Sequence, residues 1–145
     1  MNRKHRILAA VTVLTVLAIW GQSLMSRDAS TAESSWVLIK VNALFNIIFG
    51  SSAATEHAVR KTAHFTEYFI LGLEYAGLQW QDFSWKQAGI AANGALVTAF
   101  LDESIQLVSG RSAEVRDVWI DFAGAAAGIA LMAAFHGIPG KREYY

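Results

Sequence analysis

Four apolar stretches, each near the length of a membrane-spanning helix, alternate with short polar segments along this chain of 145 residues. The first covers about residues 7–26 and contains no charged side chain. The others cover about residues 57–80, 87–104 and 117–136. A helix needs about 20 predominantly apolar residues to cross the roughly 30 Å hydrocarbon layer of a bilayer. The pattern therefore predicts four membrane-spanning helices in one bundle.

A fifth, shorter apolar stretch covers about residues 36–50 and is interrupted by Lys40, Asn42 and Asn46. Its length is more typical of an interfacial or re-entrant helix than of a span. If it did cross the membrane, the orientation of everything after it would be reversed. We therefore expect an all-α fold: an integral membrane four-helix bundle with an additional short interfacial or re-entrant helix, in a single domain over residues 1–145.

The composition agrees with a membrane protein. Hydrophobic residues make up 54% of the chain and charged residues only 17%, whereas soluble domains carry about 25% charged residues. A small soluble protein of this kind would expose large apolar patches. The chain contains no cysteine, which excludes disulfides and thiolate metal sites. Its formal net charge of zero argues against nucleic acid as a partner.

The first apolar stretch follows a basic start made by Arg3, Lys4 and Arg6. A secretory signal peptide begins in the same way. No clear small-x-small cleavage site follows the stretch, and the later stretches are apolar too, so we expect an uncleaved anchor. Basic residues favour the cytoplasmic side, which would place both chain ends in the cytoplasm. Counted together, the 12 lysines and arginines of the chain divide evenly between the two faces, so their count does not strengthen this orientation.

Ionisable and amide side chains gather at one end of each of the last three stretches. They are Arg60, Lys61, His64, Glu67, Tyr68, Asp102, Glu103, Gln106, Arg111, Arg116, Asp117 and Asp121. The start of the second stretch, the end of the third and the start of the fourth share one membrane face in either orientation. Spacings of three and four residues put many of these side chains on one stripe of their helix. Because a charge that faces lipid costs at least a few kcal/mol, we expect a charged pocket inside the bundle, on the extracytoplasmic side.

Two short motifs stand out within this set. One is K-x-x-H-F-x-E-Y from Lys61 to Tyr68, and the other is D-E-x-x-Q from Asp102 to Gln106. With the segments 110–112 and 116–117, their order and spacing closely resemble the VanZ-like family, over nearly the whole chain. The resemblance implies a multi-pass protein of the bacterial cytoplasmic (inner) membrane. It also implies an association with glycopeptide resistance, since the family is named for a protein that lowers sensitivity to teicoplanin. It implies no particular reaction.

One hypothesis is that the pocket binds an envelope lipid, a lipid-linked cell-wall precursor or a lipoglycopeptide. Mixed charge at the mouth of a bundle suits a zwitterionic or anionic headgroup. The ligand-binding candidates are Arg60, Lys61, His64, Tyr68, Gln106, Arg111 and Arg116.

A second hypothesis is a membrane-embedded enzyme acting on a lipid-phosphate-type substrate, by metal-dependent or acid/base chemistry. The catalytic candidates are His64, Glu67, Asp102 and Glu103. Candidate ligands for a divalent metal are His64, Glu67, Asp102, Asp117 and Asp121, which offer imidazole nitrogen and carboxylate oxygen. The sequence leaves open whether the chain is an enzyme.

A third hypothesis is that the charges only tie helix ends together, for example through a salt bridge between Arg116 and Glu103. A separate carboxylate, Glu74, is expected to extend to the inner interface, with contact to a neighbouring helix as the alternative. Small residues at four-residue spacing, Gly124 with Gly128 and Gly72 with Ala76, are typical of close helix contacts. They suggest a homo-oligomer through small-residue faces, although such pairs also arise by chance in helices rich in alanine and glycine.

Overall fold

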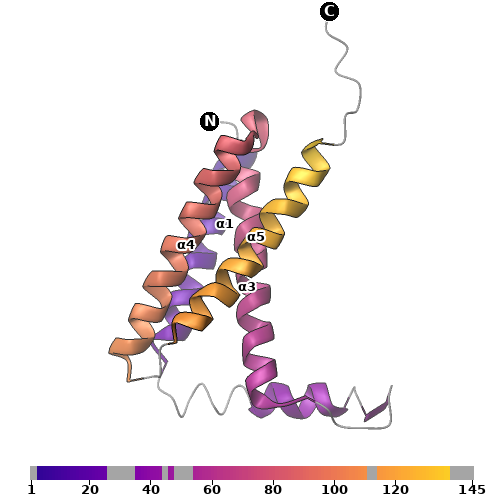
Figure 1. The fold of residues 1–145 in the computed structure, drawn as a ribbon, viewed down its shortest axis with the longest axis vertical. Coiled ribbons are helices and arrows are strands. Elements are labelled where there is room, and N and C mark those ends of the chain that lie inside the picture. Colours follow the sequence, from indigo (N-terminus) through magenta and orange to yellow (C-terminus); the bar gives the residue numbers. More distant parts are fainter. Residues whose placement is uncertain (1–2, 26–34, 44–45, 48–53, 111–113, 138–145) are drawn as a thin grey trace, which may run out of the picture.

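In the computed structural model, all regular secondary structure within the described part of the chain is helical. The described residues are 3–25, 35–43, 46–47, 54–110 and 114–137. The all-α fold class predicted from the sequence is confirmed. Figure 1 shows the long helices running alternately in opposite directions, with the start of the first long helix and the end of the last at the same end of the bundle.

The main helices are α1 (Arg3–Ser23), α3 (Glu56–Leu78), α4 (Trp85–Val108) and α5 (Val115–Gly137), and a short 3₁₀ turn, η1 (Trp80–Asp82), joins α3 to α4. Each tight connection has an identifiable cause. The hydroxyl groups of Thr55 and Ser84 accept hydrogen bonds from backbone N–H groups in the first turns of α3 and α4, as N-caps do. Past the end of α4, Gly110 has a φ of 77°, a conformation that glycine adopts at low cost.

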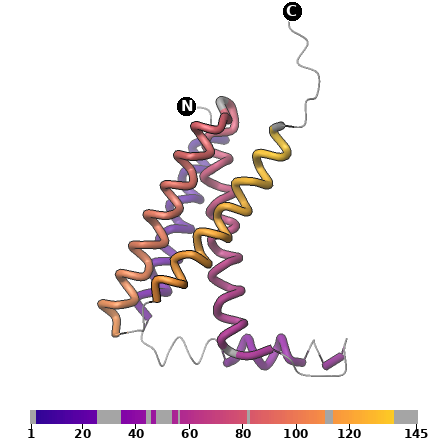
Figure 2. The backbone as a smooth tube through the Cα atoms, in the orientation of Figure 1, coloured from indigo at the N-terminus to yellow at the C-terminus, as the bar shows by residue number. Residues whose placement is uncertain are grey.

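Helix α3 is central to the bundle because it packs against α1, α4 and α5. The backbone trace in Figure 2 shows α5 crossing α3. Glycines make this crossing tight: a Cβ atom added at Gly72 would lie 2.2 Å from the carbonyl oxygen of Ala125, and one at Gly124 would lie 2.3 Å from that of Phe65. Gly128 makes a similar approach farther along α5. These small-residue faces are therefore used within one chain, so a homo-oligomer built on them would have to displace α3 from α5.

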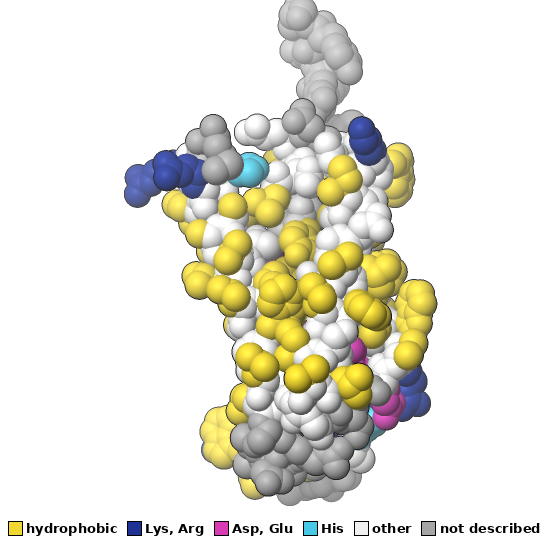
Figure 3. All heavy atoms as spheres, turned by 90° about the vertical axis from the view of Figure 1, so that its left-hand side faces the viewer, with side chains coloured by type: hydrophobic (Ala, Val, Ile, Leu, Met, Phe, Trp, Pro, Cys, Tyr) yellow, Lys and Arg dark blue, Asp and Glu magenta, His cyan; other side chains and the backbone are white. Residues whose placement is uncertain are grey.

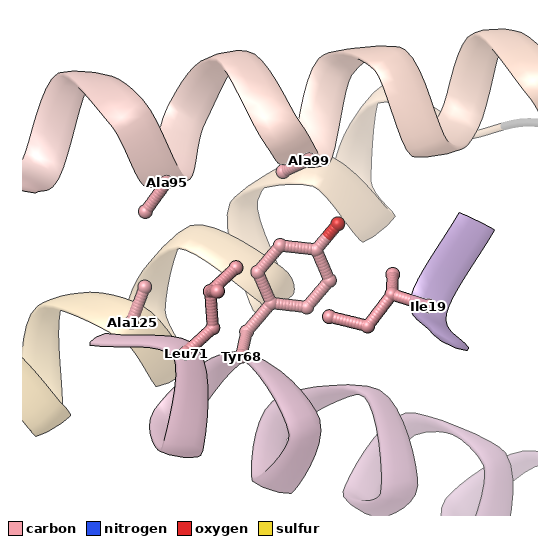
Figure 4. Close-up of a cluster of buried hydrophobic side chains, with 6 residues drawn as sticks. All are labelled: Ile19, Tyr68, Leu71, Ala95, Ala99 and Ala125. Carbon is pink, nitrogen blue, oxygen red and sulfur yellow. The ribbon is translucent and has the colours of Figure 1, made fainter. Parts of the chain in front are cut away.

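The core near the middle of the bundle is small and tightly packed. Figure 4 shows the Tyr68 ring between Leu71 and Ile19, with its hydroxyl on the side of Ala99 in α4. Tyr68 and Leu71 are both fully buried. The alanines of α4 and α5 let the larger side chains of α3 fill the interior.

The distribution of polarity is inverted relative to a soluble protein. Carboxylates and amides of α3, α4 and α5 are buried, while large apolar side chains face outward. The exposed apolar side chains include Leu14, Leu17, Val97, Phe100, Leu131 and Phe135. On the face in Figure 3, hydrophobic side chains cover the middle and charged ones lie near the two ends. A protein that presents apolar surface outward and buries its ionisable groups is suited to lipid as its solvent.

Among the described residues, two helices are long and apolar enough to cross a membrane by length and composition, namely Arg3–Ser23 and Val115–His136. Helices α3 and α4 have similar lengths, but α3 carries more charged residues and α4 carries several uncharged polar ones, among them Gln87, Asn93 and Gln106. On α3, Glu74 is 9% exposed and accepts a hydrogen bond of 2.9 Å from the hydroxyl of Thr15 in α1. The expectation that Glu74 extends to the interface is therefore wrong, because its Oε1 accepts from a hydroxyl on a neighbouring helix inside the bundle, where its Oε2 has no hydrogen-bond partner among the described residues.

The stretch predicted as interfacial or re-entrant is helical over residues 35–43 and 46–47, and its remaining residues lie outside the described part. Figure 1 shows this segment lying across the end of α3 rather than along the bundle. The Asn42 side chain holds it there: its amide donates to the carbonyl of Ala54 at 3.1 Å and accepts from the N–H of Ala54 at 3.0 Å. Its position relative to a membrane surface stays a prediction.

Candidate functional site

The charged cluster lies where the C-terminal ends of α1 and α4 meet the N-terminal halves of α3 and α5, at the end of the bundle opposite the start of α1 and the end of α5 (Figure 1). At its centre are His64 of α3, Asp102 of α4 and Asp121 of α5, which each offer one ligand atom within 4.8 Å of the others. Three stretches far apart in the sequence therefore bring ionisable groups to one place, as the shared membrane face and helical stripes predicted.

His64 and Asp121 face each other across the α3–α5 contact. The imidazole Nδ1 lies 3.5 Å from Asp121 Oδ1, an ion-pair distance that is long for a hydrogen bond. The Asp121 side chain is 0% exposed, and neither of its oxygens has a hydrogen-bond partner among the described residues. His64 is 21% exposed, so it connects this buried carboxylate to the surface.

Asp102 is equally buried but fully supported by hydrogen bonds. The Ser23 hydroxyl donates to its Oδ1 at 2.5 Å, and the Gln106 amide donates to its Oδ2 at 3.2 Å. Ser23 is held in turn, because the Ser109 hydroxyl donates to its carbonyl oxygen at 2.9 Å. Asp102 is thus fixed from both α1 and α4.

Glu103 lies beside Asp102 and closes the cluster toward the α4–α5 connection. It accepts from the Gln106 amide at 3.2 Å and from the backbone N–H of Glu114 at 3.1 Å. These contacts tie the end of α4 to the start of α5. Of the catalytic candidates, Glu103 therefore has the clearest structural role.

The basic candidates lie at the rim. Lys61 forms an ion pair with Asp117 that joins α3 to α5. Arg116 is exposed and pairs with Glu114 at 2.9 Å. The expected salt bridge from Arg116 to Glu103 is absent from the described contacts, because Glu103 takes its hydrogen bonds from a nearby amide and a backbone N–H instead.

Two further ligand-binding candidates differ in accessibility. Arg60 is partly buried in the first turns of α3, close in sequence to Lys61. Tyr68 is fully buried, and its hydroxyl has no hydrogen-bond partner among the described residues, so it lies beneath the mouth and not at it. Arg111 lies outside the described residues.

Glu67 stands where the charged cluster meets an apolar groove. Its carboxylate hydrogen-bonds the side chain of Gln22 in α1 and interacts electrostatically with His64, Asp102 and Asp121. The same residue lines a groove of about 680 Å³. The other residues of that groove come from the helical segment 35–43, from the residues just before α3 and from its first half: Val37, Val41, Ala54, Ala58, Val59, Thr62, Ala63 and Thr66.

The carboxylates at the centre of the cluster repel each other. Two carboxylates about 5 Å apart repel each other by about 3 kcal/mol at the effective dielectric constant of roughly 20 that describes protein sites. Asp102 and Asp121 are such a pair, and His64 stands beside both of them. The arrangement can therefore hold a proton or a cation at its centre, and it can position an imidazole against a carboxylate as acid/base catalysis requires.

Sequence reasoning missed two parts of this site. It assigned no role to Ser23, although the Gln22–Ser23 pair at the end of the first apolar stretch is part of the resemblance to the VanZ-like family. It also missed the groove. Val37 and Val41 line the groove together with Glu67, and no sequence pattern specifies how the segment that carries the two valines packs against α3.

Comparison with known proteins gives one match. A family model described as VanZ/LLP1 matches residues 7–136, nearly the whole chain. No match was found among curated proteins, and none among solved structures.

Proposed function

We propose a function for this chain from the premise that it belongs to the VanZ/LLP1 family and is a VanZ-like membrane protein. It binds an amphiphilic component of the cell envelope, with the apolar chain of the ligand in the groove and the headgroup at the charged cluster. The ligand class is an envelope lipid, a lipid-linked cell-wall precursor or a lipoglycopeptide. The observation that carries the proposal is the position of Glu67, which lines the groove and also belongs to the charged cluster.

The apolar part of the ligand is suggested by the groove itself. Apart from two threonines and Glu67, its lining is valine and alanine, and it runs along the outer side of α3. Its volume of about 680 Å³ falls in the range of small-molecule sites. An acyl or prenyl chain fits such a groove without leaving polar groups unsatisfied.

The chemistry of the headgroup follows from where the basic and acidic side chains lie. Lys61 and Arg116 lie at the rim, whereas Glu67 lies deeper, at the groove. A headgroup that carries a phosphate and a terminal ammonium matches both positions when it folds back over the cluster, with the phosphate at the rim and the ammonium at Glu67. Charge-assisted hydrogen bonds of this kind are stronger than neutral ones.

The membrane arrangement that goes with this proposal has α1, α3, α4 and α5 as four spans in a bacterial cytoplasmic membrane. Both chain ends are cytoplasmic, and the cluster opens toward the outside. Exposed apolar side chains on α4, such as Val97 and Phe100, support a lipid-facing surface beyond the two helices that can span a membrane by length and composition. The site then faces the leaflet where lipid-linked precursors and glycopeptides meet. Lowered teicoplanin sensitivity is the phenotype that we propose.

The binding proposal is tested by native mass spectrometry of the full-length protein in detergent, with phosphatidylethanolamine and phosphatidylglycerol added in equal amounts. We expect preferential retention of phosphatidylethanolamine, and its loss in Ala63→Trp, which fills the groove. Ala130→Trp is the matched control, since Ala130 is exposed on α5 away from the groove. Equal retention of both lipids, or equal retention by both variants, contradicts the proposal.

A second candidate function is an acid/base enzyme acting on a lipid phosphate. The observation that favours it is the contact of His64 with the buried Asp121, a pairing that orients an imidazole as a general base. Incubation of the protein with phosphatidic acid tests it. Release of inorganic phosphate that is lost in His64→Gln supports catalysis, and no release by wild-type protein refutes it for this substrate.

A further inference from the structure

We propose that His64, Asp102 and Asp121 form a binding site for one divalent cation of the zinc or manganese type. The three residues come from three different helices, and their ligand atoms lie within 4.8 Å of one another. Around one four-coordinate ion, with bonds of about 2.0–2.2 Å, neighbouring ligand atoms lie roughly 3.3–3.6 Å apart. His64 Nδ1 and Asp121 Oδ1 are already 3.5 Å apart. The Asp102 carboxylate would complete the site by turning toward them from its hydrogen bonds with Ser23 and Gln106.

Two buried polar groups without hydrogen-bond partners among the described residues support a ligand at this place; one belongs to a proposed ligand and the other lies outside the cluster. Both oxygens of Asp121 lack a hydrogen-bond partner among the described residues, although the side chain is 0% exposed. The hydroxyl of Tyr68, which is within electrostatic reach of Asp102 and Asp121, also lacks one in this part of the chain. Leaving a buried polar group unsatisfied costs about 1–3 kcal/mol. A cation between the carboxylates would satisfy Asp121, and its bound water would satisfy Tyr68.

The donor set indicates the class of ion. Magnesium and calcium prefer oxygen ligands alone, whereas imidazole nitrogen suits zinc and the other transition metals. One imidazole and two carboxylates therefore favour Zn²⁺ or Mn²⁺.

The proposed ligands have neighbours like those of known metal sites. Ligating carboxylates are usually oriented by hydrogen bonds from neighbouring groups. Asp102 has such support from Ser23 and Gln106. His64 is partly exposed at the mouth, which gives an ion a path to the buried carboxylates.

The experiment uses the full-length protein in detergent, stripped with a chelator and dialysed against Zn²⁺ or Mn²⁺ without added lipid. Elemental analysis should find about one ion per chain. Asp121→Asn and His64→Gln should weaken binding at least about tenfold, a loss of the size seen when metal sites are perturbed. Glu114→Gln is the control, since it removes an exposed carboxylate at the same end of the bundle and should bind as wild type does.

Thermal unfolding provides a second readout. The ion should raise the unfolding temperature of the wild type and of Glu114→Gln, and leave that of folded Asp121→Asn unchanged. The inference is overturned if the wild type retains no more ion than Asp121→Asn, or if the ion stabilises both equally. Because no lipid is present, failure of the lipid-binding proposal would leave this result unaffected.

Discussion

The imidazole Nδ1 of His64 in α3 lies 3.5 Å from Oδ1 of Asp121 in α5. The two residues meet because the backbones of α3 and α5 approach closely at Gly72 and Gly124. The site therefore depends on glycine at these two positions as well as on the charged side chains.

Replacement of Gly124 by alanine tests this dependence. The new Cβ would lie 2.3 Å from the carbonyl oxygen of Phe65, so α3 and α5 must move apart. Overpacking typically costs about 1–3 kcal/mol, and we expect a lower unfolding temperature. Gly89→Ala is the control, because nothing lies within 4 Å of its added Cβ and alanine favours the helix. If both variants unfold at the same temperature, the inference that α3 and α5 are in close contact at Gly124 is wrong.

Ser23 should contribute to stability through Asp102. Ser23→Ala removes the 2.5 Å hydrogen bond between α1 and α4 and leaves one oxygen of a buried carboxylate without its donor, a loss of about 1–3 kcal/mol. Ser104→Ala removes only a bond to the carbonyl of Phe100 in its own helix. Chemical denaturation should therefore show a larger loss for Ser23→Ala. An equal or smaller loss would contradict the tie between α1 and α4.

The sequence predicted the helices and the end of the bundle where the charges gather, for identifiable physical reasons. Apolar length determines the spans, and the alternating direction of successive helices determines which ends meet. Three- and four-residue spacing placed His64 and Glu67 on one stripe, and both lie in the cluster.

Individual partners could not be predicted because they depend on helix rotation and on connections. Arg116 pairs with Glu114, since the start of α5 turns it outward, and Glu103 takes a backbone N–H. Glu74 points at Thr15 because α1 lies against that face of α3. The role of small residues was ambiguous for a similar reason: spacing alone does not say whether Gly124 meets a helix of the same chain or of another.

Orientation in the membrane can be measured with single cysteines, because the chain has none. Val108→Cys lies at the exposed end of α4 near the cluster, and Lys86→Cys lies at the opposite end. A membrane-impermeant maleimide applied to intact cells should label the first and not the second. The reverse labelling would place the cluster on the cytoplasmic side.

The stability of Asp121→Asn separates a binding site from a structural tie. The substitution keeps the shape and removes a buried charge whose oxygens lack hydrogen-bond partners in the described part of the chain. Groups retained for function are often unfavourable for the fold, so metal-free Asp121→Asn should unfold at the same or a higher temperature than metal-free wild type. A clearly lower temperature would indicate a stabilising ion pair, whose disruption costs about 3–5 kcal/mol when buried.

The central claim is that Glu67 joins an apolar groove to a headgroup site, and lipid binding by Glu67→Gln tests it most directly. Native mass spectrometry with phosphatidylethanolamine should show at least about a tenfold loss of affinity, since 1.4 kcal/mol corresponds to tenfold and hydrogen bonds to charged groups contribute about 1.5–3 kcal/mol. Glu114→Gln, which alters an exposed carboxylate outside the groove, should bind as wild type does. Unchanged phosphatidylethanolamine binding by folded Glu67→Gln would contradict the claim.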